Sequence, residues 1–299
     1  MGVLDGKAAV VTGAGRGIGR GHCLHLAKAG ASVVVNDVDR SEAEKVVSEL
    51  NAEGARAVAS NSDIGSRAGA EAMVELCVQE FGRIDVVVNN AGIVRDRSFL
   101  KMSDEEFNDV MRVHVGGTFW GSQAAALKMR EQGSGGVIIN TTSAAHMGNF
   151  GQVNYGGAKG AIASMTYTMA LELARYGIRV NAISPSGSTR MSATYKGPDG
   201  KEVQLPFIDP ALNGPMVVFL CSDEADYITG QVFGTGGDRI ALLSQPRYGD
   251  TMLKPGGWTL DEIRAHFKNQ LGNKLEPMGL LKRPYPFYGG VRPKEEKKS

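Results

Sequence analysis

Short apolar runs alternate with longer stretches of helical character through most of the chain. Residues 33–35 are three valines, and so are residues 86–88. Runs that are apolar at every position are typical of strands buried on both faces of a sheet. Strands of this kind that alternate with helices predict an α/β fold, a doubly wound parallel sheet covered by helices on both sides.

The pattern sets the expected elements. We expect strands at residues 8–12, 32–36, 55–60, 85–89, 137–141, 179–184 and 232–235. We expect helices at residues 16–29, 41–51, 66–81, 104–129, 155–176 and 209–220. Gly116 and Gly117 lie inside the fourth of these helices and favour an interruption there.

Two regions fall outside this alternation. Residues 190–208 are rich in glycine, proline and polar residues, and we expect a mobile loop over the pocket. Residues 241–299 follow the last expected strand and carry one helical stretch at residues 260–271. The charged tail at residues 294–299 is expected to be disordered. We therefore divide the chain into a domain at residues 1–240 and a C-terminal extension at residues 241–299.

Composition excludes several classes of function. A net charge of +1 over 299 residues gives no global field for nucleic acid or an anionic membrane. The chain has no run of eighteen apolar residues that could span a bilayer. Its first residues show no charged segment followed by an apolar one, so we expect no secretory signal. Cys23, Cys77 and Cys221 have no metal-binding spacing, so we expect reduced, packed thiols, no metal site and a cytoplasmic location.

A glycine-rich turn follows the first expected strand. Its core is Gly13, Arg16, Gly17, Ile18 and Gly19, which lead into the first turn of the first expected helix. Glycines here allow a tight turn and let a helix N-terminus approach a pyrophosphate. A strand, this turn and a helix in that order predict a Rossmann-type dinucleotide site.

An acidic residue ends the second expected strand. Asp37 lies eighteen positions beyond Gly19, where a carboxylate can accept hydrogen bonds from an adenosine ribose. It would repel a 2′-phosphate that carries up to about two negative charges. Arg16 argues the other way, because a cation in the turn would attract that phosphate. We expect Asp37 to dominate, since an exposed arginine can turn into solvent, and we predict NAD rather than NADP.

Polar residues also follow the third and fourth strands. Asp63 and Ile64 come after the third strand, where a carboxylate could bind the adenine amino group. Asn90, Ala91 and Gly92 follow the fourth strand, beside the expected nucleotide crevice. Each of these could be only a turn signal, but their order along the chain favours cofactor binding.

Tyr155 and Lys159 are four residues apart on an expected helix, so their side chains share a face. Ser143 precedes them, at the end of an apolar run. Lowering a phenol pKa from about 10 to about 7 takes roughly 4 kcal/mol. A unit charge about 4 Å away supplies about 1 kcal/mol in water and about 4 kcal/mol at an effective dielectric of about 20. The pair must therefore be shielded from water, and a bound dinucleotide would exclude water from it.

These ordered motifs resemble the short-chain dehydrogenase/reductase family over about residues 5–240. The resemblance implies that Tyr155 exchanges the hydroxyl proton and that Ser143 hydrogen-bonds the reacting oxygen. It implies that Lys159 lowers the phenol pKa and holds the nicotinamide ribose, while hydride moves to or from nicotinamide C4.

Three departures from the family pattern stand out. The family's usual spacing from tyrosine selects Thr142, whereas counting from the preceding strand selects Ser143, which we favour. His114 occupies a position where the family usually has an asparagine that holds a relay water, and it could be a relay member or a structural histidine. Pro185 is followed by Ser186 rather than glycine, and the resemblance implies that Thr189 contacts the nicotinamide carboxamide.

With these departures, the chain resembles a narrower group within the family. His114 and residues 148–155 are similar to the dehydrogenase part of the type-2 peroxisomal multifunctional enzyme. That resemblance implies NAD-linked oxidation of a 3-hydroxyacyl-CoA to the 3-ketoacyl-CoA. The final residues 297–299 are no peroxisomal address, which favours a free-standing cytoplasmic enzyme.

Two other functions stay open. The chain could oxidise a free steroid or another secondary alcohol, because the sequence does not give the shape of the pocket. It could instead be a nucleotide-sensing regulator, although such proteins can lose the tyrosine or lysine that this chain keeps. The resemblance also implies a homodimer or homotetramer through the tyrosine-bearing helix, whose small and apolar positions are Ala161, Ala163, Met165, Met169 and Ala170.

Overall fold

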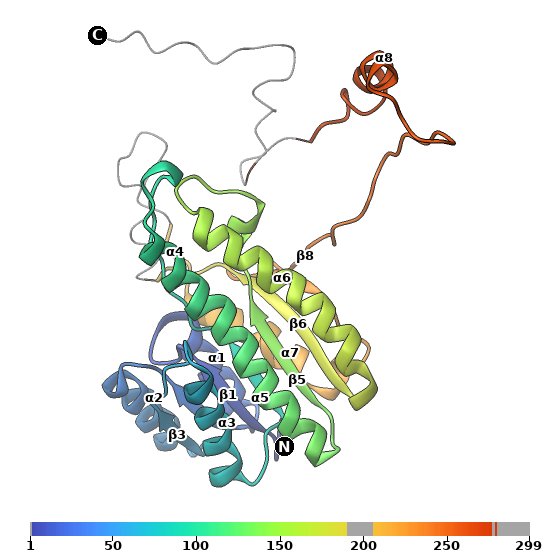
Figure 1. Cartoon of the computed structure of the whole chain (residues 1–299). Coiled ribbons are helices and arrows are strands. Elements are labelled where there is room, and N and C mark those ends of the chain that lie inside the picture. The colour runs from blue at the N-terminus through green and yellow to red at the C-terminus, as the bar shows by residue number, and fades with distance from the viewer. Residues whose placement is uncertain (1, 190–205, 277–278, 280–299) are drawn as a thin grey trace, which may run out of the picture.

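The computed structural model describes residues 2–189, 206–276 and 279. An eight-stranded sheet forms its centre, in the order β3-β2-β1-β4-β5-β6-β7-β8 (Figure 1). The strands are β1 (Ala8–Thr12), β2 (Ser32–Asn36), β3 (Ala57–Ser60), β4 (Val86–Asn89), β5 (Gly136–Thr141), β6 (Ile178–Pro185), β7 (Val232–Thr235) and β8 (Ala241–Leu242). All neighbouring strands run parallel except β7 and β8, which are antiparallel. The predicted doubly wound α/β fold is confirmed, and the short strand β8 is an addition to it.

Helices cover both faces of this sheet. The helices of the described residues are α1 (Gly17–Lys28), α2 (Arg40–Ala52), α3 (Arg67–Phe81), α4 (Asp104–Met111), α5 (Gly117–Gln132), α6 (Val153–Leu173), α7 (Gly214–Cys221) and α8 (Leu260–Gln270), of which α8 lies away from the sheet (Figure 1). One core packs α1, α2 and α7 on one face of the sheet, through side chains such as Leu26, Leu50 and Leu220. A second core packs α3, α5 and α6 on the other face, through Met73, Met129 and Ala170. Each central strand feeds both cores because its successive side chains point to opposite faces.

The predicted elements agree with the structure to within one or two residues at most ends. The predicted helix at 104–129 is interrupted by a π-helical turn, η2 (Arg112–Gly116), directly before Gly117. The predicted helix at 209–220 is divided into the 3₁₀ turn η6 (Pro210–Asn213) and α7. Residues 190–205 of the predicted mobile loop, and the charged tail, lie outside the described residues.

The strand order creates a crevice at the carboxyl ends of β1 and β4. The chain moves outward from β1 through β2 to β3, and then returns to β4 on the other side of β1. In open α/β sheets, ligands bind where the order reverses in this way. The turns after β1 and β4 carry the predicted cofactor residues, so the topology brings these residues to one edge.

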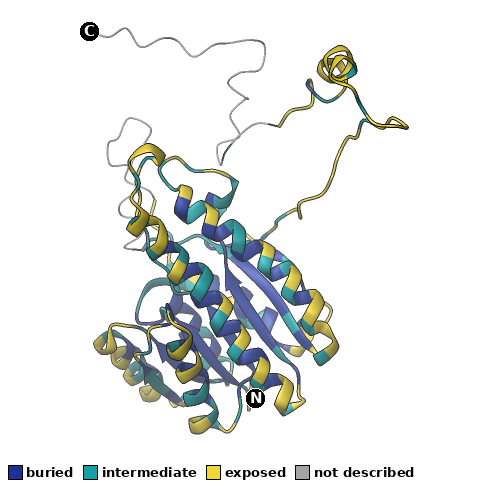
Figure 2. Cartoon of the chain, viewed as in Figure 1, coloured by how far each residue is buried: buried dark blue, intermediate teal, exposed yellow. Residues whose placement is uncertain are grey.

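The described part of the C-terminal extension leaves the sheet after β8 (Figure 1). Most of its side chains are exposed, including Tyr248, Leu253 and Leu260 (Figure 2). Helix α8 matches the predicted helical stretch, and a capping box at Thr259 and Glu262 fixes its start. This arm is therefore ordered by local interactions rather than by burial in the domain.

Candidate active site

The glycine turn after β1 is held against the end of β4. Gly13 has a φ of +61°, which favours glycine, and a Cβ at this position would lie 2.8 Å from the Ala91 Cα. The Asn90 Nδ2 donates to the carbonyls of Thr12 and Gly13, at 2.9 Å and 3.1 Å. The Thr12 hydroxyl accepts from the backbone N–H groups of Asn90 and Ala91, both at 3.0 Å. Residues predicted from two separate motifs therefore form one structure.

Helix α1 points its N-terminus into this turn. Its N-cap residue, Arg16, makes no side-chain cap hydrogen bond to the helix, so no side chain competes there for an anion. Ile18 lies beside Gly187, since a Cβ on that glycine would be 3.4 Å from the Ile18 Cγ1. The Thr189 Cγ2 would lie 3.3 Å from a Cβ at Gly17. The close packing around Gly13, Gly17 and Gly19 leaves backbone rather than side chains at the helix terminus.

Asp37 lies directly over the glycine turn. One carboxylate oxygen accepts from the Gly15 N–H at 3.0 Å, and the other accepts from the Asp39 N–H at 3.0 Å. Arg16 does not turn into solvent as the sequence suggested. Its Nη2 lies 2.7 Å from the Asp39 Oδ2, and its Nε lies 3.9 Å from the Glu42 Oε2. The only predicted cation in the turn is thus already paired with acids.

Asp63 and Ile64 have local roles in the loop after β3. The Asp63 Oδ1 accepts from the Gly65 N–H at 2.9 Å, and its Oδ2 lies 3.4 Å from Arg112. Ile64 is buried and packs against Gly117 at the start of α5. The Asp63 side chain is 58 % exposed, so its carboxylate remains accessible beside these contacts.

The predicted catalytic residues come together at the ends of β5 and α6. The Lys159 Nζ donates to the Thr141 carbonyl at 2.6 Å and lies 5.6 Å from the centroid of the Tyr155 ring. Thr142 is buried and donates its hydroxyl to the Lys159 carbonyl at 2.8 Å. Ser143 is only half-buried, and its hydroxyl accepts from the Ala145 N–H at 3.2 Å. The structure thus uses Thr142 to hold α6 and leaves Ser143 nearer to the crevice.

Burial dominates the electrostatics of this group. It lowers the pKa of Lys159 to about 7. Burial also raises the pKa of Tyr155, a hydrogen bond with Ser143 opposes this rise, and the charge of Asp96 adds to it. The sequence predicts a lowered pKa for the Tyr155 phenol, and the structure has the opposite shift. Lys159 is only partly charged at neutral pH here, so its pull on the phenol is incomplete without further acceptors around Nζ.

His114 lies in the π-helical turn η2 and is buried. Its ring meets the Tyr155 ring edge to face, with centroids 5.3 Å apart. Its Nε2 lies 3.0 Å from the Ile93 nitrogen and 2.8 Å from the Ile93 oxygen, and its Nδ1 has no hydrogen-bond partner among the described residues. Burial, and then the charge of Lys159, lower the pKa of His114 to about 3. The ring is therefore neutral at physiological pH.

A glycine makes room for this histidine. A side chain at Gly92 would collide with the His114 ring, so the two positions fit each other. On the opposite side of the crevice, Pro185 ends β6, and Ser186 donates its N–H to the Thr235 carbonyl at 2.8 Å. The missing family glycine after Pro185 is thus replaced by a serine whose backbone is held by β7.

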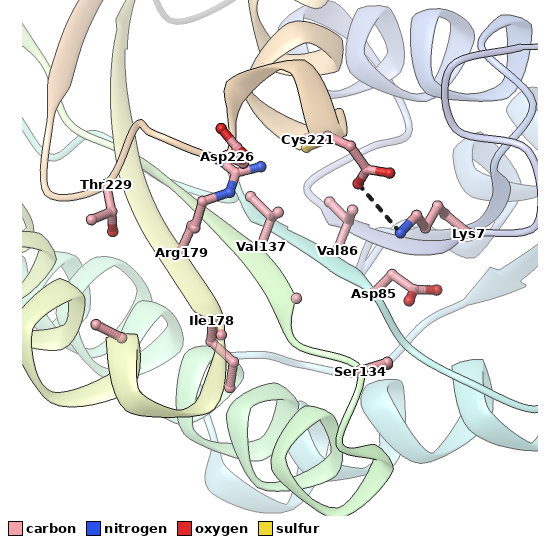
Figure 3. A pocket seen from close by; sticks show the side chains of 14 residues that line it. Lys7, Asp85, Val86, Ser134, Val137, Ile178, Arg179, Cys221, Asp226 and Thr229 are labelled. Atoms are coloured by element: carbon pink, nitrogen blue, oxygen red, sulfur yellow. Dashed lines mark ion pairs between the residues drawn. The ribbon is translucent and has the colours of Figure 1, made fainter.

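A well-defined cavity lies elsewhere in the molecule. It has a volume of about 500 Å³ and lies at the amino ends of β1, β4, β5 and β6 (Figure 3). Lys7, Asp85 and Arg179 contribute charges to its wall, and the dashed line marks the 3.7 Å contact between Lys7 and Asp223. The glycine turn and the tyrosine lie at the other edge of the sheet. We assign the site by its chemistry and not by the size of this cavity.

Two classes of feature are absent from the part of the chain that the structure describes. None of its helices has the length and apolar character needed to cross a membrane. Within the same residues, no three His, Cys, Asp or Glu side chains form a group that could hold a metal ion. Cys23, Cys77 and Cys221 are all free and buried.

Known proteins share this architecture. The family model for short chain dehydrogenase matches residues 7–197. The hydroxyacyl-CoA dehydrogenase ChsB1 of Mycobacterium tuberculosis is 39 % identical over 287 residues, which cover 91 % of this chain and 90 % of that protein. The peroxisomal hydratase-dehydrogenase-epimerase of Neurospora crassa is 38 % identical over 84 % of this chain. This chain spans only 28 % of that longer protein.

Solved structures agree. The crystal structure of a short chain dehydrogenase from Mycobacterium avium matches with a TM-score of 0.82 and 38 % identity, over 96 % of this chain and 100 % of that one. A 7α-hydroxysteroid dehydrogenase complexed with NADH and 7-oxo glycochenodeoxycholic acid matches with a TM-score of 0.68 and 33 % identity, over 79 % of this chain and 94 % of that one.

The chain belongs to the short-chain dehydrogenase family. It is an oxidoreductase that acts on CH–OH groups. The resemblance stated from the glycine turn and the tyrosine–lysine pair is confirmed, and so is the prediction of an enzyme over the alternative of a nucleotide-sensing regulator.

Sequence reasoning missed several residues that shape the site. Thr12 bridges the turns after β1 and β4, and its place at the end of a strand was the available signal. Asp39 and Glu42 pair with Arg16, and acidic residues at the start of an expected helix could have suggested them. Asp96 and Gln152 gave no local signal, because their contact joins distant parts of the chain.

Proposed function

We propose that this protein is an NAD-dependent dehydrogenase that interconverts a 3-hydroxyacyl-CoA and the 3-ketoacyl-CoA. The observation that carries the proposal is the convergence of the Tyr155 and Lys159 side chains with Ser143 at the carboxyl edge of the sheet. The substrate class is supported by the name of the mycobacterial relative, which covers most of this chain.

Tyr155 is the acid-base residue in this proposal. In the oxidation, its phenolate accepts the proton of the substrate hydroxyl while Ser143 donates a hydrogen bond to the reacting oxygen. General acid-base groups of this kind contribute about 10²- to 10⁴-fold in rate. Lys159 stabilises the phenolate by its charge, which is worth most in a site that excludes water.

A nicotinamide dinucleotide fits the residues around the crevice. The backbone at Gly13, Arg16, Gly17, Ile18 and Gly19 would face the pyrophosphate, as the uncapped N-terminus of α1 supports. The adenosine half would meet Asp37, Asp63 and Ile64, and the nicotinamide half would meet a second set of residues. These residues are Asn90, Ala91, Gly92, Tyr155, Lys159, Pro185 and Thr189. When bound, the cofactor supplies a carbon that accepts or donates hydride.

The cofactor also bears on the charge of Lys159. The Nζ has one carbonyl partner in the structure, that of Thr141. Ribose hydroxyls would add acceptors and favour the charged form of the lysine. In that state the lysine stabilises the phenolate, so we propose that the acidic phenol expected from sequence belongs to the cofactor-bound protein.

Preference for NAD is supported by the acids around the glycine turn. Asp37 lies over the turn, and the guanidinium of Arg16 forms ion pairs with Asp39 and Glu42. A 2′-phosphate would therefore meet negative charge and no free cation among these residues. We expect kcat/KM to be at least about 10-fold higher with NAD than with NADP, and Asp37→Ser to reduce this ratio. Asp104→Asn is a control of equal charge change away from the turn, and an equal or better kcat/KM with NADP for the unmodified enzyme would refute the preference.

His114 keeps two possible roles within the proposed function. Its Nε2 contacts with Ile93 support a positioning role, because they fix the segment after β4. Its unpartnered Nδ1 supports a relay role, since this is the ring atom available to a water molecule. In either role, His114→Asn should retain most of the activity, because asparagine can still form hydrogen bonds. His114→Leu should reduce the activity by about 10-fold or more.

A steroid or another free secondary alcohol is the second candidate substrate. It is supported by the similarity to the 7α-hydroxysteroid dehydrogenase. Initial rates of NADH formation across 3-hydroxyacyl-CoA thioesters and free hydroxysteroids distinguish the two. Turnover of the steroids alone would replace the acyl-CoA assignment, and no turnover of either class would contradict the proposed function.

We further propose a cytoplasmic homodimer or homotetramer. Three buried free thiols support a reducing compartment. The predicted contact face on α6 needs a correction, because Ala163 and Ala170 are only 6 % and 4 % exposed and pack inside the subunit. Leu171 is 83 % exposed on the same helix and supports a contact there. A monomer by light scattering at working concentrations would exclude the assembly.

A further inference from the structure

Two loops border the proposed catalytic crevice, and they are joined to each other. One follows β4 and contains Asp96 and Arg97, and the other precedes α6 and contains Gly151 and Gln152. The Arg97 N–H donates to the Gly151 carbonyl at 2.8 Å. The Gln152 Nε2 lies 3.1 Å and 3.0 Å from the two carboxylate oxygens of Asp96. These contacts link segments that are more than fifty residues apart in sequence.

The same junction fixes the start of α6. Gln152 is the N-cap residue of that helix, three positions before Tyr155, and its Oε1 accepts from the Asn149 Nδ2 at 2.8 Å. Both ends of the Gln152 amide are therefore held. Asn154 is fully buried, and its Nδ2 donates to the carbonyls of Arg95 and Glu106 at 2.9 Å and 3.1 Å. The residues on the N-terminal side of Tyr155 are thus anchored to the loop after β4 and to α4.

We propose that Asp96 and Gln152 form a clamp that positions the start of α6 and holds a carboxylate charge at the N-cap residue of that helix, three positions before Tyr155. This inference rests on the proposed role of Tyr155 as the acid-base residue. Asp96 is a positioning residue in this account and does not touch the reacting atoms.

The charge of Asp96 is poorly balanced by its neighbours. Arg95 lies 3.6 Å from Asp109, and Arg97 pairs with Glu106 at 2.8 Å, so the adjacent cations are directed to α4. Asp96 itself makes no ion pair with any residue that the structure describes. The charged and titratable groups that face the phenol from the surrounding elements are Lys159 on α6, His114 on η2 and Asp96 on the loop after β4.

Of these groups, Asp96 is the one that acts against the phenolate. Burial is the largest cause of the raised pKa of Tyr155, and the Asp96 carboxylate adds to the rise. Asp96 is exposed in the ligand-free protein, so water screens part of this effect. A substrate that fills the crevice would remove water and strengthen it. Asp96 therefore offsets part of the help that Lys159 gives and keeps Tyr155 a stronger base.

The test separates the charge of Asp96 from its hydrogen bond. Asp96→Asn removes the charge and keeps an oxygen that can accept from Gln152. In alcohol oxidation kcat/KM rises with pH as the phenol ionises, so this variant should move the rising limb to lower pH while kcat/KM at the plateau changes by less than about 3-fold. Asp104→Asn makes the same change in net charge on α4 and should leave the profile in place.

Titration of the phenol itself gives a readout without turnover. With ring-labelled ¹³C-tyrosine, the Tyr155 resonance is assigned by its loss in Tyr155→Phe. Its titration midpoint should be lower in Asp96→Asn than in the unmodified protein, and unchanged in Asp104→Asn. Gln152→Ala breaks the clamp but keeps the Asp96 charge, and should reduce kcat/KM by about 10-fold across the pH range.

The outcomes distinguish this inference from the function on which it rests. If Tyr155→Phe is inactive while Asp96→Asn leaves both the pH profile and the ¹³C midpoint unmoved, the placement of charge by the clamp is wrong and the proposed function stands. A fully active Gln152→Ala overturns the positioning part. An active Tyr155→Phe removes the proposed acid-base role of Tyr155, and the ¹³C midpoint still reports whether Asp96 acts on the phenol.

Discussion

The two edges of the sheet bury charged groups in different ways. At the amino edge, Asp85 is 5 % exposed, and its carboxylate accepts from the Ala8 N–H at 2.8 Å and from Arg83 at 2.7 Å and 2.6 Å. At the carboxyl edge, Lys159 is 2 % exposed and donates to one carbonyl, and its pKa falls to about 7. The first charge is well satisfied and the second is not. In this protein, a buried charged group therefore indicates a catalytic site only where its surroundings do not stabilise the charge.

The largest expected effect belongs to the carboxyl edge. Tyr155→Phe removes the group that exchanges the proton, so kcat should fall by about 10³-fold or more. Its free energy of unfolding should change by less than about 1 kcal/mol, because the ring and its packing remain. Rates of NADH formation and urea unfolding curves measure the two quantities. A loss of stability large enough to explain the loss of activity would contradict the assignment of a catalytic role, rather than a structural one, to this residue.

Lys159→Met should separate activity from stability most clearly. The variant keeps an unbranched apolar side chain, one atom shorter than that of lysine, but loses the charge, so kcat should fall by about 10²-fold. At pH 7 the ligand-free protein should gain about 1–3 kcal/mol in unfolding free energy, because a poorly satisfied buried charge is removed. An equal or lower stability than the unmodified protein would show that the lysine is better satisfied than its surroundings indicate.

At the amino edge the opposite result is expected. Asp85→Ala leaves the Ala8 N–H and the Arg83 guanidinium without their carboxylate, so the unfolding free energy should fall by about 1–3 kcal/mol. The kcat/KM of the folded enzyme should stay within about 2-fold, since the residue is far from the crevice. A loss of kcat/KM with unchanged stability would make this edge functional.

The pH dependence of stability sharpens the same contrast. The pKa of Lys159 is about 7 in the folded protein and 10.5 for an ordinary lysine, so the unfolded chain binds more protons than the folded protein between pH 7 and pH 10.5. Stability therefore rises with pH over that window, by about 1–2 kcal/mol between pH 7 and pH 8.5 from this group. Unfolding curves of the unmodified protein and Lys159→Met should converge as the pH rises, and parallel curves would contradict the assignment.

The smallest effect should come from an exposed charge at the amino edge. The Asp223 side chain is 92 % exposed and lies 3.7 Å from Lys7. Asp223→Ala should change neither kcat/KM by more than about 2-fold nor the unfolding free energy by more than about 0.5 kcal/mol. A larger change would show that the cavity of Figure 3 depends on this pair.

Much of the fold could be predicted because its signals are local. Strands β1 and β2 have the predicted bounds, since each contains a short apolar run that ends at a turn. The glycine turn and the pair of Tyr155 and Lys159 were found because a few residues at fixed spacing define them. The π-helical turn η2 was placed only approximately, as two glycines mark a weak point without specifying its geometry.

The rest of the site depends on tertiary packing. The raised pKa of Tyr155 follows from burial, which the spacing of two residues on a helix does not contain. The Arg16 pairs with Asp39 and Glu42 need the start of α2 to lie against the turn after β1. The Asp96–Gln152 clamp needs two loops brought together by β4 and α6. Each of these interactions modifies a residue whose presence was predicted, and none has a signature of its own in the sequence.

The central claim is that the Tyr155 hydroxyl exchanges the proton while NAD binding depends little on that hydroxyl. Single-turnover formation of NADH from a 3-hydroxyacyl-CoA, measured beside the NAD binding isotherm for the unmodified protein and Tyr155→Phe, tests this most directly. The account predicts unchanged NAD affinity to within about 3-fold and a hydride-transfer rate lower by about 10³-fold in the variant. Equal rates, or a loss of NAD binding that explains the whole defect, would contradict it.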